Sequence, residues 1–293
     1  MKLRLGTRGS ALARAQSNGI VDMLREQGHD VELVVIRSEG DVDRRSLAEI
    51  GGQGAFTAAL SRALLDDRID FAVHSLKDLP TRQMEGLTLG AVPRRADPRD
   101  ALITRWGTGS LIQGSTIGTG SLRRSVQLSG SRTHKIADLR GNVDTRLARL
   151  LKGDFDGVVL AMAGLQRLGL SPSQEAGWQW APLKIEDMTP AVGQGALGLE
   201  CRSDRHDVIS ALATVEDAAT REAILIERQL LGRLGGGCQV PFAAHVTEGV
   251  CHLMLADPVE GRVVCRMQGP ATGAGDLFTR MQALHGPLIS RLI

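Results

Sequence analysis

The stretch Ile117-Gly118-Thr119-Gly120-Ser121-Leu122-Arg123-Arg124 combines the end of a strand, a tight turn and the start of a helix. The strand is expected to end at Gly118, and the Ser121 hydroxyl is suited to cap the helix that follows. Arg123 and Arg124 then lie in the first helical turn, where exposed N–H groups and the helix dipole favour an anion. The stretch therefore predicts an α/β unit with an anion site at its strand-to-helix turn.

A second stretch of this kind stands near the N-terminus. An expected strand from Leu3 to Leu5 leads into Gly6-Thr7-Arg8-Gly9-Ser10, and Ser10 is the expected cap of a helix that starts at Ala11. The two stretches indicate two similar α/β lobes, although a repeat of five residues is weak and a chance match stays open.

A further strand end carries polar side chains. The strand expected from Asp70 to His74 delivers Ser75, Lys77 and Asp78 just beyond its carboxyl end, which is the edge where ligands bind in open α/β sheets. Arginines also stand at or just after the expected strand ends, namely Arg8, Arg123, Arg124, Arg140, Arg146 and Arg167. Each alone is an ordinary surface residue. Together with Ser10, Ser121 and Lys77 they predict a ligand with several carboxylates, because a guanidinium group offers a bidentate fork to a carboxylate.

The remaining pattern predicts more elements and a third domain. Strands are expected at 31–36, 156–162, 242–247, 251–256 and 262–267, and helices at 55–65, 205–234 with a break at 215–217, and 276–292. The last three strands and the last helix indicate a small domain of their own.

Length and composition limit the function. A chain of 293 residues is too long for one typical core, so two or three domains are expected. Because 35 Lys and Arg residues stand against 33 Asp and Glu, we expect no overall basic field for nucleic acid or membrane. We also expect no membrane span, no export signal and no zinc site, since the apolar runs and cysteine spacings that these features need are missing.

Four cysteines, Cys201, Cys238, Cys251 and Cys265, form no disulfide framework, which favours a reducing cytoplasm. Cys238 lies in Gly235-Gly236-Gly237-Cys238-Gln239-Val240-Pro241. Consecutive glycines are kept where a positive φ or the close approach of another group is needed. A tight turn over a small buried thiol explains this stretch as well. The other three cysteines stand in apolar settings and are expected in the core.

Several longer motifs, in order along almost the whole chain, resemble those of the porphobilinogen deaminase (hydroxymethylbilane synthase) family. They are Val73-His74-Ser75-Leu76-Lys77-Asp78-Leu79-Pro80, Gly118-Thr119-Gly120-Ser121-Leu122-Arg123-Arg124, Leu139-Arg140-Gly141-Asn142-Val143, Ala163-Gly164-Leu165-Gln166-Arg167-Leu168-Gly169-Leu170, Pro190-Ala191-Val192-Gly193-Gln194-Gly195-Ala196 and Gly236-Gly237-Cys238-Gln239-Val240-Pro241. The resemblance implies an α/β protein of three domains, two lobes like those of periplasmic binding proteins and a small α+β C-terminal domain. It places the first lobe at 1–95 and 192–214, the second at 96–191, and the third, with Cys238, at 215–293.

The resemblance also implies a transferase of haem biosynthesis. Such an enzyme joins four porphobilinogen molecules head to tail into linear hydroxymethylbilane and releases ammonia, on a dipyrromethane primer held by a thioether at Cys238. It implies a cytoplasmic monomer whose product passes to uroporphyrinogen-III synthase, without nucleic acid, membrane or metal. Porphobilinogen carries an acetate and a propionate, which agrees with the arginines at the strand ends.

Residue roles follow from the same resemblance. Asp78 is the implied catalytic group, because a carboxylate offsets positive charge that develops on a pyrrole ring as ammonia leaves. A lone carboxylate there also suits a helix cap or a partner of Lys77. The implied cofactor-binding residues are Cys238, Lys77, Asp78, Ser121, Arg123, Arg124 and Arg146, and the implied substrate-binding residues are Arg8, Ser10, Arg140 and Arg167. We expect His74 to point inward as a structural residue.

One loop departs from the family pattern. Many members carry lysines where this chain has Glu49, Gln53 and Ala58, and Arg44 and Arg45 precede them. Either these arginines compensate for the lost charge, or the loop is a solvated lid whose charges contribute little, since exposed ion pairs are worth about 0 to 1 kcal/mol. Two other functions stay open, a carboxylate-binding protein that uses a two-lobe cleft without catalysis and an inactive relative of the family.

Overall fold

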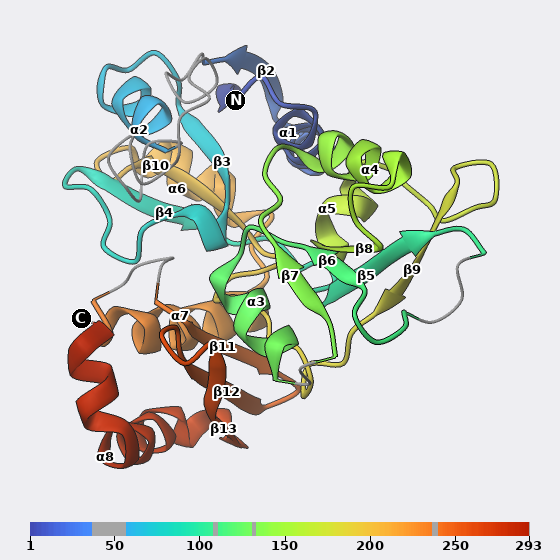
Figure 1. Ribbon diagram of the computed structural model, residues 1–293. Helices are drawn as coiled ribbons and strands as arrows, with labels where there is room; N and C mark the ends of the chain where they lie inside the picture. Colours follow the sequence, from blue (N-terminus) through green and yellow to red (C-terminus); the bar gives the residue numbers. More distant parts are fainter. Residues whose placement is uncertain (37–56, 108–110, 131–132, 236–239, 293) are drawn as a thin grey trace.

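Three β-sheets organise the part of the chain that the structure describes (Figure 1). The computed structural model describes residues 1–36, 57–107, 111–130, 133–235 and 240–292. Two sheets have five strands each and carry helices, and the third has three strands. The expected α/β architecture of two lobes and a smaller third domain is confirmed, and the domain boundaries given above stay a prediction.

The first sheet has the strand order β2-β1-β3-β10-β4. These strands are β1 (Lys2–Thr7), β2 (Asp30–Val35), β3 (Phe71–Ser75), β4 (Leu87–Ala91) and β10 (Leu197–Arg202). β1 is parallel to β2 and β3, whereas β10 is antiparallel to β3 and β4. The helices packed on this sheet are α1 (Ala11–Glu26), α2 (Ala58–Leu65) and α6 (His206–Ala213). The chain thus returns to the first sheet after it has built the second.

The second sheet repeats this plan, with the order β7-β6-β8-β5-β9. Its strands are β5 (Asp100–Arg105), β6 (Thr116–Gly118), β7 (Lys135–Ala137), β8 (Gly157–Ala161) and β9 (Trp178–Pro182), and its helices are α3 (Leu122–Ser129), α4 (Val143–Lys152) and α5 (Met162–Arg167). β6 is parallel to β7 and β8, whereas β5 is antiparallel to β8 and β9. The first sheet has the same arrangement. The short repeat in the sequence therefore reflects two lobes of one topology.

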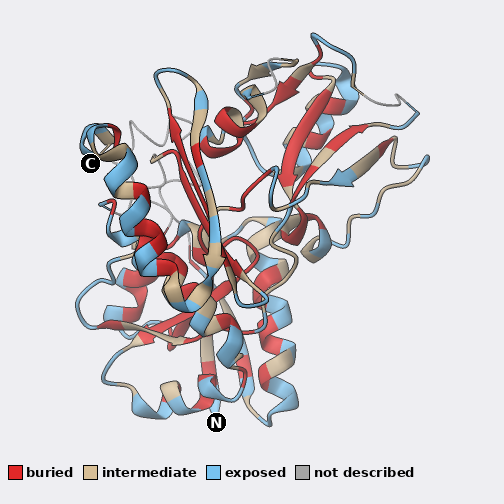
Figure 2. Ribbon diagram, turned by 90° about the horizontal axis from the view of Figure 1, so that it is seen from below, coloured by how far each residue is buried: buried red, intermediate tan, exposed pale blue. Residues whose placement is uncertain are grey.

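The third sheet is an antiparallel meander of β11 (Phe242–Thr247), β12 (Val250–Asp257) and β13 (Arg262–Pro270). Helices α7 (Ala218–Gly232) and α8 (Ala274–Leu292) pack on it, and α3 of the second lobe also contacts β12 and β13. Figure 2 shows buried and exposed residues alternating along α8, and its Phe278 and Met281, three residues apart, are fully buried against the sheet. The helix bends at His285, two residues before Pro287, as a proline inside a helix requires.

Two segments outside the helices and strands, residues 92–99 and 188–196, connect the first two sheets and touch each other. The Ala96 N–H donates to the Gly195 carbonyl at 3.1 Å. Gly195 has φ +87°, and a Cβ there would stand 2.5 Å from the Ala96 carbonyl oxygen. Gly193 has φ +72°, and a Cβ there would stand 3.0 Å from the Lys77 nitrogen. Both positions require glycine, because the other connecting segment approaches Gly195 and the turn at Leu76 and Lys77 approaches Gly193.

The elements expected from the sequence are present, with shifts of a few residues at their ends. The helix expected at 55–65 is described from Ala58 onward, and the break at 215–217 separates α6 from α7 as expected. Strands β4, β5, β9 and β10 were not expected, and β7 was expected only as the strand before the turn at Leu139. In the described ranges no helix has the length and apolar character needed to cross a membrane.

Candidate functional site

Lys77 and Asp78 follow β3 in a single turn of 3-10 helix that starts at Leu76. The Leu76 side chain is buried, and its N–H donates to a carbonyl of the second connecting segment at 3.1 Å, which fixes the turn. Asp78 is exposed and Lys77 is partly buried. Burial lowers the pKa of Lys77, while the charge of Asp78 opposes this shift and the charge of Arg124 adds to it. Lys77 of the first lobe therefore lies within electrostatic reach of the second lobe.

Ser121, Arg123 and Arg124 lie at the start of α3, and the Ser121 hydroxyl accepts the Arg124 N–H as an N-cap at 3.4 Å. Both guanidinium groups are buried and donate to the carboxylate of Asp100, Arg123 at 2.7 Å and Arg124 at 2.7 and 3.1 Å. Although burial alone would raise it, the charges of the two arginines lower the pKa of Asp100 to about 2. Arg123 and Arg124 therefore share a buried counter-ion, and their role in binding the cofactor stays a prediction.

Asp100 was missed in the sequence, since its partners lie more than 20 residues away along the chain. It is fully buried at the start of β5, and the Gln194 amide also donates to it at 2.9 Å. The same amide donates to the Pro98 carbonyl at 2.7 Å, so Gln194 links the two connecting segments to this cluster. An Asp two residues after a proline and directly before an apolar run is a signal that could have marked it.

Arg140 and Arg146 flank the N-terminus of α4. Arg146 is partly buried and donates to the Gly141 carbonyl at 2.7 Å. Burial lowers the pKa of Arg146, the charge of Arg124 adds to this effect, and the charge of Asp138 opposes it. Arg140 is exposed and paired with Asp138 at 2.8 Å. Arg146 therefore joins Arg124 and Lys77 in one cluster of cations, whereas Arg140 stands at its edge.

Arg8, Ser10 and Arg167 lie where the two lobes meet through α1 and α5, which contact each other. The Ser10 hydroxyl accepts the Ala13 N–H at 3.2 Å and caps α1 as expected. Arg8 is partly buried. Arg167 donates to the Gly195 carbonyl at 2.7 Å, and burial lowers the pKa of its guanidinium to about 10. These residues therefore lie near the contact between α1 of the first lobe and α5 of the second lobe.

Two predicted features lie outside the described residues. Cys238 is one, and only its flanks are described, Gly235 with φ +75° and the strand that begins at Phe242. The other is the loop with Glu49 and Gln53, together with Arg44 and Arg45. Their expected roles stay predictions.

The expected structural residues are in the core. His74 is buried, with its Nε2 3.2 Å from the Glu200 carboxylate, which is itself buried on β10. Cys201, Cys251 and Cys265 are buried free thiols, and burial raises the pKa of each, to about 11 for the first two. His74 and these three cysteines are therefore core residues, as expected.

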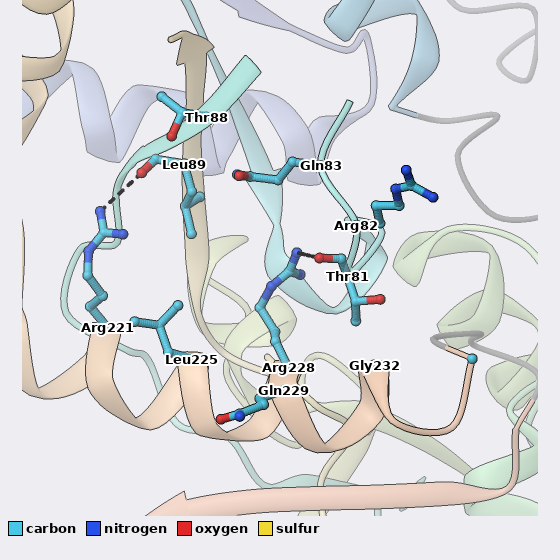
Figure 3. Close-up of a pocket in the computed structure, with 11 residues that line it drawn as sticks. Thr81, Arg82, Gln83, Thr88, Leu89, Arg221, Leu225, Arg228, Gln229 and Gly232 are labelled. Atoms are coloured by element: carbon cyan, nitrogen blue, oxygen red, sulfur yellow. Dashed lines mark hydrogen bonds between the residues drawn. The ribbon is translucent and has the colours of Figure 1, made fainter. Parts of the chain in front are cut away.

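An open groove of about 650 Å³ lies between α7 and the segment 81–89 (Figure 3). Two of its arginines are already bonded, Arg228 to backbone carbonyls and Arg221 to Glu216 and to the carbonyls of Leu89 and Gly90. The groove therefore has less free positive charge than its composition suggests. Lys77 and Arg124 do not line this groove.

Residues 3–210 match the family model described as "Porphobilinogen deaminase, dipyromethane cofactor binding domain". The chain belongs to the porphobilinogen deaminase family. It is 47% identical to porphobilinogen deaminase 1 of Streptomyces coelicolor over 83% of this chain and 77% of that one. It is 44% identical to the porphobilinogen deaminase of Brevibacillus brevis, over 85% and 81%, and 45% identical to that of Mycobacteroides abscessus, over 89% and 83%. Substrate binding domain 2 of Lactococcus lactis GlnP, a solved structure, is similar at 10% identity over 75% of this chain and 89% of that one, with a TM-score of 0.44.

The cation cluster of this porphobilinogen deaminase family member fits an anionic cofactor. Lys77, Arg123 and Arg146 all have pKa values lowered by burial and by neighbouring positive charge. An anionic group bound among them would relieve both effects, because it replaces lost hydration and offsets the repulsion. Asp100 compensates only part of this charge, as two arginines share it. The residues present are therefore suited to the carboxylates of a dipyrromethane.

Proposed function

We propose that this protein is a hydroxymethylbilane synthase, a transferase that condenses four porphobilinogen molecules head to tail and releases ammonia. The observation that carries the proposal is an exposed carboxylate, Asp78, beside a partly buried cluster of cations in a chain of this family. Each porphobilinogen brings two carboxylates and one amine that must leave, so the reaction needs cations for binding and a carboxylate for the chemistry.

The residues that would hold the dipyrromethane are Cys238 as covalent anchor, with Lys77, Ser121, Arg123, Arg124 and Arg146 around its carboxylates. When bound, the dipyrromethane supplies the pyrrole carbon to which the first porphobilinogen is joined. Asp100 and the carbonyls of Thr189 and Val159 hold both guanidinium groups in place, so their charge is fixed before an anion arrives. Preorganised charges of this kind need little reorganisation when an anion arrives.

Asp78 would act on the incoming substrate. Its carboxylate is exposed on a turn whose backbone is fixed, so it can stand beside the pyrrole nitrogen as positive charge develops during loss of ammonia. Arg8, Ser10, Arg140 and Arg167 are proposed to bind the substrate carboxylates. Arg167, with its pKa lowered by burial, would gain most from such a partner.

Mass spectrometry of the intact protein tests the proposal. The purified protein should carry the mass of two linked pyrrole units on Cys238 and show a ladder of further single-unit additions after incubation with porphobilinogen. A carboxylate-binding protein or an inactive relative would bind porphobilinogen without a ladder and without ammonia release. A chain that stays at its unmodified mass under these conditions contradicts the proposal.

The same proposal includes the cellular compartment, the oligomeric state and the enzyme that receives the product. Three buried free thiols suit a reducing compartment, which supports a cytoplasmic enzyme. We propose a monomer, to be checked by light scattering during gel filtration. The linear product must be closed into a ring by another enzyme, and uroporphyrinogen-III synthase is the proposed recipient.

A further inference from the structure

Helix α7 holds the backbone that directly follows Asp78. The Arg228 guanidinium donates to three consecutive carbonyls, Leu79 at 3.1 Å, Pro80 at 2.5 Å and Thr81 at 3.3 Å. Figure 3 shows Arg228 rising from α7 toward this segment. A planar guanidinium with five donors can bridge several carbonyls at once, which a lysine ammonium on a flexible stem does less well.

Arg228 occupies an unusual place for a cation. Its side chain is 8% exposed, and within the described ranges it forms no ion pair. Burial lowers the pKa of Arg228, and the charge of Glu200 at longer range opposes this shift. Carbonyl oxygens alone therefore replace the hydration of a buried charge, which is costly to leave unsatisfied. Such an arrangement fixes the three carbonyls as firmly as it fixes the arginine.

A second contact of α7 reaches the same turn. Ile224, one helical turn before Arg228, is fully buried in one cluster with Leu76 and Leu79. These two leucines flank Lys77 and Asp78. Lys77 and Asp78 thus lie on a short backbone segment that is attached to α7 twice, by the apolar contact of Ile224 and by the guanidinium of Arg228. Both side chains come from one face of the helix.

We propose that Arg228 is a positioning residue for Asp78, through which α7 sets the place of the carboxylate. Two attachments to one helix, the guanidinium of Arg228 and the side chain of Ile224, hold the backbone on both sides of Asp78. The inference rests on the proposed function, since it assigns Asp78 a part in the reaction.

The chain offers a matched control on the same helix. Arg221 also donates to carbonyls of the first lobe, those of Leu89 and Gly90 at 3.2 and 3.1 Å, but at the far end of the segment from Asp78. Arg221→Met and Arg228→Met therefore both remove an attachment of α7 to the first lobe. Only the second change should affect the carboxylate.

Steady-state kinetics and hydrogen exchange of the holoenzyme, measured well below the melting temperature of each variant, test the inference. Arg228→Met should lower kcat at least tenfold with KM changed less than threefold, and should speed amide exchange at residues 76–83. Arg221→Met should leave kcat within twofold and speed exchange at 88–91. Arg228→Lys, which keeps the charge and part of the bonding, should give an intermediate kcat.

Three outcomes decide the matter. The inference is overturned if Arg228→Met has the kcat of wild type. It is also overturned if Arg221→Met loses as much kcat as Arg228→Met when both variants show the same drop in melting temperature. Should Arg228→Met fail to fold, Arg228→Lys with wild-type kcat and wild-type exchange overturns it instead. If wild type itself forms no pyrrole ladder, the proposed function fails, and this result is distinct from a failure of the positioning role.

Discussion

Asp78 combines an exposed carboxylate with a backbone that is held on both sides, and this arrangement suits a group that must meet a developing charge. Asp78→Asn keeps the shape and removes the negative charge. We expect a loss of single-turnover rate of roughly a hundredfold to a thousandfold, or about 2.7–4 kcal/mol, as is typical when one stabilising group of this kind is removed. Rapid-quench measurement of ammonia release checks this, with Glu85→Gln, an exposed acid of the same loop, as control. An unchanged rate would remove Asp78 from the chemistry.

Cys238 is the second residue whose chemistry can be isolated. Cys238→Ser replaces a thiol by a much poorer nucleophile, so we expect folded protein without a covalent pyrrole adduct and without turnover. Cys265→Ala is the matched control, because Cys265 is buried in β13 and should not affect the adduct. Intact mass and circular dichroism check both variants. Bilane production near the wild-type rate in Cys238→Ser would contradict the role of the thiol.

In the second lobe the sequence predicted the capped helix and its cations, but not the buried counter-ion that holds them. The spacing of Ser121, Arg123 and Arg124 predicted a capped helix with cations in its first turn, and this is confirmed. The burial of both arginines on Asp100 could not be predicted, because β5 and α3 come together only through the order of the second sheet. Local sequence patterns predict caps and turns, whereas the counter-ion of a buried arginine depends on tertiary contacts that they do not contain.

Among the elements, an apolar pattern predicted some strands but not all, because β4, β5 and β10 also carry apolar residues and were not expected. Phe242–Thr247 was expected with its observed bounds. β7 has three residues, Lys135–Ala137, and β9 ends in a proline, so neither shows a strand pattern by itself. Both lie at the edges of the second sheet and exist because β6 and β5 offer them partners. Their conformation is set by the sheet more than by their own residues.

The crossing of the connecting segments makes a prediction at the level of the element. Gly195→Ala should lower the free energy of unfolding by at least about 1–2 kcal/mol, the usual cost of a left-handed conformation with a Cβ, and the approach to Ala96 adds to this. Gly19→Ala, inside α1 with open space around it, should instead stabilise by about 0.5–1 kcal/mol. Urea unfolding of the two variants checks this. Equal stability of Gly195→Ala and wild type would mean that the crossing tolerates a side chain.

For the whole molecule, one buried carboxylate joins the two connecting segments to the third sheet. Glu227 of α7 is fully buried and accepts from Arg95 at 2.6 and 3.1 Å, from the Gly193 N–H at 2.8 Å and from the Val246 N–H at 2.8 Å. Although burial would raise it, the charge of Arg95 and the contact with His245 lower the pKa of Glu227 to about 2. Asp100 in the second lobe also has a pKa lowered to about 2.

Both shifts make stability depend on pH in one direction. A carboxylate with a lowered pKa in the folded state stabilises above its unfolded pKa of roughly 4, and this contribution is lost as the pH falls toward 2. We therefore expect the free energy of unfolding to fall steadily below about pH 5. Urea unfolding at pH 7, 5, 4 and 3 checks this, and Glu227→Gln should be less stable at pH 7 with a shallower pH dependence. A variant with the slope of wild type would exclude Glu227 as a source of the effect.

The place of β10 between β3 and β4 has a consequence for how the chain is made. On the ribosome, the second sheet is complete once Pro182 has emerged, whereas the first sheet lacks an inner strand until Arg202 is available. Because domains tend to fold as units during synthesis, the second lobe can close before the first. Until then, β3 and β4 of the nascent chain have unpaired edges, and these exposed edges are the point at which a chaperone would be expected to bind.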